Sequence, residues 1–193
     1  TRNFVNYATT AAQGDYLIIT NRRLLGGTNN PVEAYRTYRS TAAGGGFSAK
    51  IYDIDELCDQ FAFGIKMHPL SIKNFLRFAR ANFATAPKNC FLIGKGVTYD
   101  ELRINENNPL AAQLQLVPTY GYPGSDNLLA SADLTALPAT PIGRLSVVNA
   151  AEVNTYLEKV KQYEAAQANP SVSQADKAWM KNVVHVVGAN DAG

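Results

Sequence analysis

Two cysteines and two histidines are the residues of this sequence that could supply a thiol nucleophile, a general base or a zinc ligand. Cys58 lies on a short predicted helix and Cys90 opens an apolar strand, so we expect both to be inert core thiols. His68 precedes a proline in a turn and is expected at the surface, whereas His185 lies among valines and is expected in the core. Neither histidine has a cysteine or a second histidine at ligand spacing, so the sequence predicts no zinc site.

The glycines and serines form none of the motifs that mark a nucleotide site or an activated serine. The sequence has no Gly-x-Ser-x-Gly, no P-loop and no glycine-rich dinucleotide turn. Residues 44–46 are three glycines between a predicted helix and a predicted strand. A phosphate cradle needs the reverse order, strand then glycines then helix, so we interpret this run as a helix stop.

Carboxylates occur in two long irregular segments that follow predicted strands. Asp100 lies in the first segment, and Asp126 and Asp133 lie in the second, which is rich in glycine, proline and serine. Oxygen ligands on irregular loops suit calcium, so Asp126 and Asp133 are candidate calcium ligands. The alternative is that these are solvated turn residues. Arg144 follows a glycine in a predicted strand, where a guanidinium needs a carboxylate or carbonyl partner, and we expect a structural role for it.

The elements that must position these side chains alternate between strand and helix. Apolar runs predict strands over residues 15–20, 47–53, 89–94, 142–147 and 179–188. Helical spacing predicts helices from Asn30 to a glycine stop at 44, over 54–63, from Ser71 onward and over 149–166. Residues 96–108 and 121–141 are expected to be loops. This order predicts an α/β fold with a mostly parallel central sheet and helices on both faces, as one unit over residues 1–193.

Polar residues at the predicted helix starts support these boundaries. Asn30 is followed by a proline and by Glu33, and Asn149 is followed by Glu152, which is the spacing of a capping pair. Ser71 is the expected cap of the helix that it begins. The valine run within 179–188 suits a strand covered on both faces, as in a parallel sheet.

Composition and charge exclude several classes of function. The 193 residues are 46% hydrophobic and 18% charged, which is typical of a globular chain with a substantial core. The net charge of +2 is too small to indicate a nucleic-acid partner. No apolar run approaches the length of a membrane-spanning helix.

Several segments, taken in order, resemble the first half of the gingipain-like cysteine peptidase domain, a family that includes the gingipains and the sortase-like peptidase of type IX secretion. The resemblance covers the chain from about Asp15 onward. The matching segments are 15–20, Phe63-Gly64, Ser71-Ile72-Lys73-Asn74-Phe75-Leu76, Phe91-Leu92-Ile93-Gly94, Val117-Pro118-Thr119-Tyr120, Ser125-Asp126, Ile142-Gly143-Arg144-Leu145, Glu152, 159–164 and 179–188.

The resemblance implies a three-layer, caspase-like fold whose catalytic histidine and cysteine lie downstream, in a second half that this chain does not contain. It implies that the loop after 179–188 carries an acidic residue that orients the histidine. Asn190 or Asp191 occupies that region here, and Asp191 is the only carboxylate. The family's calcium region corresponds to the loops around Gly94 and residues 126–133. Lys95 stands where the family usually has an aspartate, and a lysine cannot ligate calcium.

The resemblance therefore identifies the chain as the N-terminal subdomain of a cysteine endopeptidase, inactive on its own. It implies a protein or peptide substrate and the remainder of the peptidase domain as partner. It implies that no cofactor is required, although calcium could be bound. It also implies a secreted, periplasmic or outer-membrane surface location in a bacterium. One alternative is a flavodoxin-like or receiver-like binding module. In a receiver, acidic residues would follow strands 15–20 and 89–94, where Asn21 and Lys95 stand. The other alternative is a catalytically dead peptidase-like assembly domain.

Overall fold

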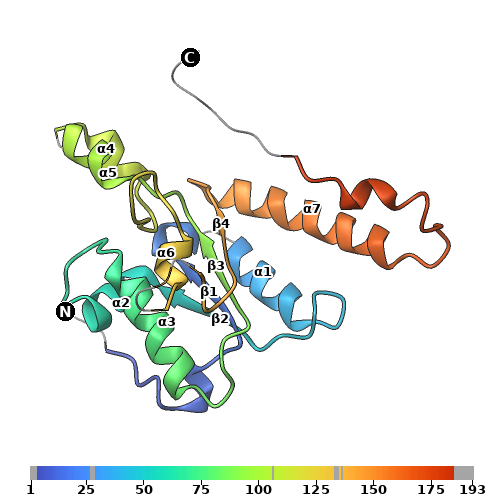
Figure 1. Cartoon of the computed structure of the whole chain (residues 1–193), viewed down its shortest axis with the longest axis horizontal. Coiled ribbons are helices and arrows are strands. Elements are labelled where there is room, and N and C mark those ends of the chain that lie inside the picture. The colour runs from blue at the N-terminus through green and yellow to red at the C-terminus, as the bar shows by residue number, and fades with distance from the viewer. Residues whose placement is uncertain (1–3, 27–28, 106, 133–134, 136, 185–193) are drawn as a thin grey trace.

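The computed structural model describes residues 4–26, 29–105, 107–132, 135 and 137–184 (Figure 1). The strands are β1 Tyr16–Thr20, β2 Ala49–Asp53, β3 Asn89–Ile93 and β4 Ile142–Leu145. The α-helices are α1 Pro31–Ser40, α2 Ile54–Phe61, α3 Leu70–Asn82, α4 Tyr99–Ile104, α5 Pro109–Leu114, α6 Asn127–Ala130 and α7 Ala150–Ala168. Short 3-10 helices cover Thr10–Ala12, Arg22–Leu24 and Ala178–Lys181.

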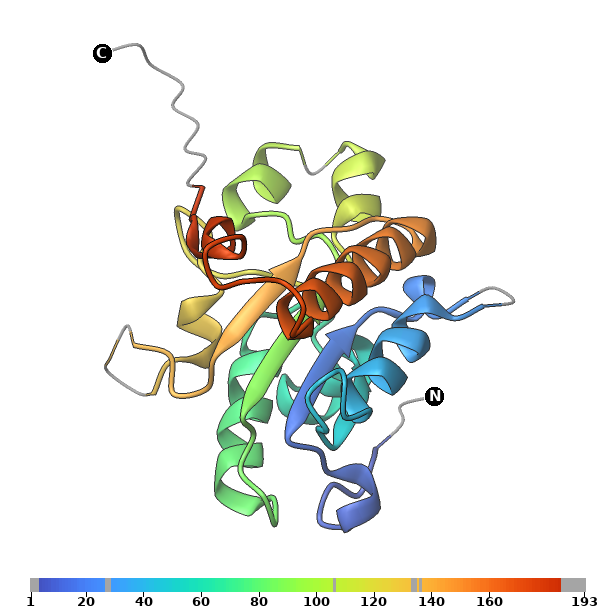
Figure 2. The same cartoon turned by 90° about the vertical axis from the view of Figure 1, so that its right-hand side faces the viewer.

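The four strands form a parallel sheet in the order β2-β1-β3-β4. Helices α2 and α3 cover one face, and α1 and α7 cover the other (Figures 1 and 2). Successive side chains of a strand point to opposite faces, so Leu17 and Ile19 pack with α2 and α3, and Tyr16 and Ile18 pack with α1 and α7. Every residue of β1 is buried, as expected for a central parallel strand. The predicted three-layer α/β fold is confirmed.

The helix starts show which caps the sequence predicts correctly. The Asn30 side chain accepts a hydrogen bond from the backbone N–H of Glu33, and Asn149 does the same for Glu152. Ser71 is not the cap of α3, and that prediction is wrong. The helix begins at Leu70, whose N–H donates to Nδ1 of His68, and the Ser71 hydroxyl is buried without a hydrogen-bond partner in the described structure. His68 thus satisfies one N–H of the first turn, because a neutral imidazole nitrogen can accept a hydrogen bond.

The predicted buried strand over 179–188 is wrong where the structure describes it. Trp179 lies in a 3-10 helix, and Val183 and Val184 are 75% and 83% exposed. A β-branched run is only a local preference, and a covered strand also needs a neighbouring strand and helices on its faces. Neither reaches these two valines in the described structure. Residues 185–188, with His185, lie outside the described residues.

Two segments predicted as loops contain short helices. Helix α4 lies within 96–108 and α6 lies within 121–141. Asp100 and Glu101 occupy the first turn of α4, where carboxylates interact favourably with the helix dipole. Among the described residues, no helix is both long and apolar enough to cross a bilayer.

A network of polar side chains joins α7 to α1. Arg39 of α1 donates to Oε1 of Glu164 over 2.7 Å, and the Tyr38 hydroxyl donates to the other carboxylate oxygen over 2.6 Å. Arg39 also donates to the hydroxyl of Tyr35, which lies 3.0 Å from the hydroxyl of Tyr16. This network fixes the C-terminal part of α7, where few apolar residues face the core.

Candidate functional site

The carboxyl edge of the sheet is where an open α/β fold places its functional groups, especially where the strand order reverses. Here the reversal lies between β1 and β3, and the chain itself fills the crevice. Asn21 donates to the carbonyl of Leu116 over 3.2 Å, and the N–H groups of Leu116 and Val117 donate to the carbonyl of Lys95. Leu116 and Val117 are buried. In the part of the chain that the structure describes, these residues occupy the crevice in which a flavin or a receiver phosphorylation site would lie, which disfavours the flavodoxin-like and receiver-like alternatives.

Arg144 of β4 joins the loops at this edge. Its Nε and Nη2 donate to the two carboxylate oxygens of Asp126, each over 2.8 Å. Its Nη1 donates to the carbonyls of Gly94 and Val117 over 2.8 Å, and Nη2 donates to the carbonyl of Pro118 over 2.9 Å. An arginine side chain has five N–H donors, and these five bonds use all of them. The predicted need of Arg144 for carboxylate and carbonyl partners is confirmed.

Two glycines make room for this guanidinium. A Cβ on Gly96 would lie 3.2 Å from Nη1 of Arg144 and 3.0 Å from the carbonyl oxygen of Val117. Gly94 has a φ of +142°, and a Cβ there would lie 2.9 Å from the Val117 side chain. Side chains at these positions would displace either the arginine or the segment that fills the crevice, so the glycines on both sides of Lys95 have a packing role.

The structure describes one of the two candidate calcium ligands, Asp126. Both carboxylate oxygens of Asp126 accept from Arg144, and Oδ1 also accepts from the Thr119 hydroxyl over 3.1 Å. Asp133 lies outside the described residues. In the described part of the chain, no three His, Cys, Asp or Glu residues are placed to hold a metal ion. A calcium site at these loops stays a prediction, and at Asp126 a cation would share the carboxylate with a guanidinium.

Thermal melting with calcium and with a chelator checks the calcium prediction. A bound ion stabilises the folded state by mass action, so a site near Asp126 raises the melting midpoint at millimolar calcium. Asp126→Asn should then abolish that rise. A midpoint that is the same in calcium and in chelator contradicts a stabilising site.

A groove of about 370 Å³ opens at this edge, and Thr119, whose hydroxyl donates to Asp126, is one of its lining residues. One wall is the start of α3 with His68 and Leu70, and the other is the segment that contains Tyr120 and Tyr122. Its other lining residues are Pro69, Tyr99, Asp100, Thr119 and Gly121. Tyr99, Tyr120 and Tyr122 are 71%, 53% and 85% exposed, which is unusual for three neighbouring aromatic side chains. This groove was not predicted from the sequence. The signal available in the sequence was the presence of tyrosines within polar segments.

Neither cysteine is placed for nucleophilic chemistry. Cys58 and Cys90 are each 2% exposed, and burial raises the pKa of both thiols. A thiol must ionise to attack a carbonyl, and burial in an apolar core opposes that ionisation. The prediction that both are inert core thiols is supported by this burial. His68 lies in the turn before α3, is half-exposed, and uses Nδ1 to accept from the backbone.

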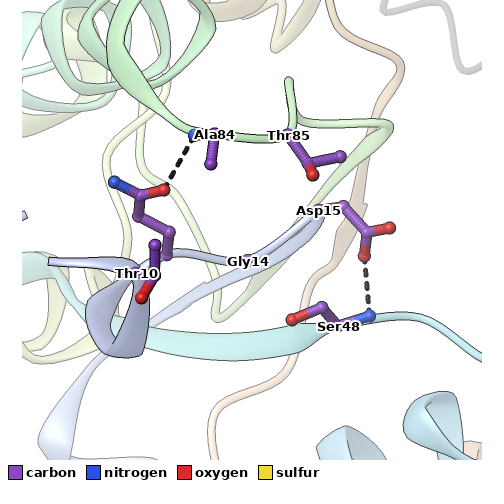
Figure 3. A pocket seen from close by; sticks show the side chains of 7 residues that line it. Thr10, Gly14, Asp15, Ser48, Ala84 and Thr85 are labelled. Carbon is purple, nitrogen blue, oxygen red and sulfur yellow. Dashed lines mark hydrogen bonds between the residues drawn. The ribbon is translucent and has the colours of Figure 1, made fainter. Parts of the chain in front are cut away.

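A second hollow, at the amino edge of the sheet, has a structural role (Figure 3). Asp15 accepts from the N–H of Ser48 over 2.8 Å and from Lys88 over 2.8 Å, which links the starts of strands β1, β2 and β3. Gln13 accepts from the N–H of Ala84. At about 150 Å³, this hollow is smaller than the range of about 300–1,000 Å³ typical of ligand pockets.

Comparison with known proteins gives one match. The model of peptidase family C25 matches residues 9–193, a range that includes the whole sheet, the groove and Asp191. Asp191 itself lies outside the described residues. No curated protein and no solved structure matches the chain.

Proposed function

The chain belongs to peptidase family C25, the gingipain family, and we propose that it is the first subdomain of a cysteine endopeptidase whose nucleophile lies in another part of the protein. In such an enzyme a cysteine thiolate, activated by a histidine, attacks the peptide carbonyl while backbone donors stabilise the oxyanion. This chain contributes the scaffold and part of the wall along which the substrate lies.

The burial of both cysteines is the observation that carries this proposal. Cys58 and Cys90 are enclosed in the core cluster between the sheet and helices α2 and α3. A peptide carbonyl cannot reach either sulfur without opening that core. This burial supports the proposal that the nucleophile of the peptidase lies outside this chain.

The groove supports the assignment of a substrate wall. It lies at the carboxyl edge of a parallel sheet, where α/β enzymes bind their substrates, and its lining surface is mostly apolar and includes three tyrosines. Tyr120 and Tyr122 offer rigid, amphipathic contact surface that an extended polypeptide can meet at low entropic cost. Protein or peptide substrates are proposed on this basis.

The location is proposed from the family alone. Gingipain-like peptidases act outside the cytoplasm, so we propose a secreted, periplasmic or outer-membrane surface protein that uses type IX secretion. Fractionation of the producing bacterium with an antibody against this chain checks the proposal, and a cytoplasmic signal contradicts it.

An activity assay tests the subdomain assignment. The 193-residue chain is incubated with a broad peptide library, with and without a thiol-reactive inhibitor. We expect no turnover, because both cysteines are buried and burial opposes the ionisation that a nucleophilic thiol needs. Turnover that Cys58→Ala or Cys90→Ala abolishes would overturn the assignment.

Asp191 is the proposed orienting carboxylate of the catalytic histidine in the whole enzyme. A carboxylate in that role holds the imidazole in one tautomer and stabilises the imidazolium that forms during catalysis. Asp191→Asn in the full-length protein should therefore lower kcat far more than it raises KM. Asn190→Ala tests the neighbouring residue, to which the role would move if the Asp191 variant kept full activity. Wild-type turnover in the Asp191 variant removes the role from Asp191, and an inactive wild-type protein favours the assembly-domain alternative.

A further inference from the structure

The segment from Thr119 to Asp126, here called the tyrosine loop, is closed at its base. The Thr119 hydroxyl donates to Oδ1 of Asp126 over 3.1 Å, and the N–H of Ser125 donates to the carbonyl of Tyr120 over 2.7 Å. These two bonds hold the first and the last residues of the loop together. The loop is therefore a compact unit that moves as a whole if its base moves.

Arg144 is the residue that attaches this base to the sheet. It reaches the leaving end through the forked pair with Asp126, and the entering end through the carbonyls of Val117 and Pro118. It also bonds the carbonyl of Gly94, which follows β3. The Arg144 side chain is only 12% exposed. Because its five donors are all used and it is largely buried, Arg144 is not available to bind a substrate itself.

The tyrosine loop carries one wall of the groove. Thr119, Tyr120 and Tyr122 of the loop line the groove, together with His68, Pro69 and Leu70 at the start of α3. A second tether lies beyond the loop, where Lys73 of α3 donates to the carbonyl of Leu128 over 3.2 Å and to the Ser131 hydroxyl over 2.9 Å. That tether holds α6 beyond the loop, whereas Arg144 bonds both ends of the base of the loop, so Arg144 contributes directly to the position of the two tyrosines relative to the sheet.

We infer that Arg144 is a positioning residue for substrate specificity, which acts through Asp126 and the tyrosine loop to place Tyr120 and Tyr122 against the substrate chain. This inference rests on the proposed peptidase function. It assigns the two tyrosines to substrate contact and Arg144 to their placement. The ion pair is an arginine fork on a carboxylate, which fixes direction as well as distance, and a lysine cannot reproduce it.

Hydrogen exchange of the 193-residue chain tests the placement. Arg144→Lys keeps the charge but loses the fork, and Asp126→Asn keeps the shape but weakens the pair. Since bonds to charged groups contribute about 1.5–3 kcal/mol, the amides of the tyrosine loop should exchange roughly tenfold to a hundredfold faster. Amides of β1 and β3 should be unchanged. Arg36→Lys, which alters an ion pair with Glu33 on α1, is the matched control and should leave the loop unchanged.

If Arg144→Lys or Asp126→Asn prevents folding, a less disruptive variant still tests the placement role by hydrogen exchange. Thr119→Val removes only the hydroxyl bond to Asp126 and leaves the guanidinium pair in place. It should raise exchange within the loop by a smaller factor than Asp126→Asn. Unchanged loop exchange in Asp126→Asn and Thr119→Val would overturn the placement role.

Kinetics of the full-length peptidase test the substrate contact. With extended peptides, Arg144→Lys and Asp126→Asn should raise KM while kcat changes little, because the chemistry lies elsewhere. Tyr122→Ala should raise KM in the same way without faster loop exchange. Faster exchange with an unchanged KM overturns the substrate part of the inference. The exchange result stands even if the wild-type protein cleaves nothing, so failure of the proposed function and failure of the placement role are separate outcomes.

Discussion

Raising the pH above about 10 is expected to unfold this protein steeply, because three buried tyrosines must ionise. Tyr7, Tyr16 and Tyr52 are 4%, 8% and 3% exposed. Burial raises the pKa of all three phenols above the ordinary value of 10.0. For Tyr7, the nearby carboxylates of Glu56 and Asp53 raise the pKa further, and for Tyr16 the hydroxyl of Tyr35 does so.

The direction of the pH effect follows from proton binding. The folded state holds the phenolic proton more tightly than the unfolded state, so this contribution to stability is complete below the unfolded pKa and is lost as the pH rises above it. Between the unfolded and the folded pKa, each such tyrosine lowers the free energy of unfolding by about 1.4 kcal/mol per pH unit. At about pH 11 the three tyrosines together lower the free energy of unfolding by about 4 kcal/mol, a large share of a typical 5–15 kcal/mol.

Urea unfolding at a series of pH values from neutral to alkaline measures this loss. Tyr52→Phe removes one titrating group together with a 3.1 Å hydrogen bond to the carbonyl of Ala12. That variant should be less stable at neutral pH but should lose stability by about a third less per pH unit. Tyr122→Phe is the matched control, because its side chain is 85% exposed and meets water in both states. Stability that is independent of pH up to about pH 11 would contradict the prediction.

The sequence predicts well the features of the fold that are local. The Asn30 and Asn149 caps are confirmed because their partners lie three residues away in the chain. The central strands are confirmed because both of their faces are covered, which requires apolar runs. The valine run at 183–187 carries the same local signal, yet its described residues, Val183 and Val184, are exposed. Coverage of a strand is decided by residues distant in sequence, and local preference does not contain it.

The candidate site is predictable in kind but not in detail. The sequence indicates that Arg144 needs an acceptor, because a charge at a strand end must be paired. It does not identify Asp126, or the carbonyls of Gly94, Val117 and Pro118, as those acceptors. These groups come from separate loops, and only the folded sheet edge brings them together. The same pairing determines that Asp126, a candidate calcium ligand, binds a guanidinium in this structure.

Truncating Leu92 to alanine is the substitution with the largest expected effect on folding at neutral pH. Leu92 is fully buried in β3, between β1 and β4, in the cluster that also contains Leu17 and Phe75. Removing its terminal carbons loses burial and leaves a cavity that a sheet held by strands on both sides cannot close. The free energy of unfolding should fall by about 2–5 kcal/mol.

Denaturant melts of Leu92→Ala distinguish a cavity from a disrupted fold. A cavity lowers the midpoint while the slope with denaturant is unchanged, because the same surface is exposed on unfolding. Leu110→Ala, at a 54% exposed position on α5, is the matched control and should stay within about 0.5 kcal/mol of the wild type.

Hydrogen exchange of the tyrosine loop in Leu92→Ala gives a second test. Leu92 lies two residues before Gly94, whose carbonyl Arg144 binds. Exchange there should rise only in step with global unfolding, because the Arg144 bonds to Asp126, Val117 and Pro118 do not involve the Leu92 side chain. Loop exchange that rises well beyond the global loss would mean that β3, and not the guanidinium pair, sets the position of the groove wall.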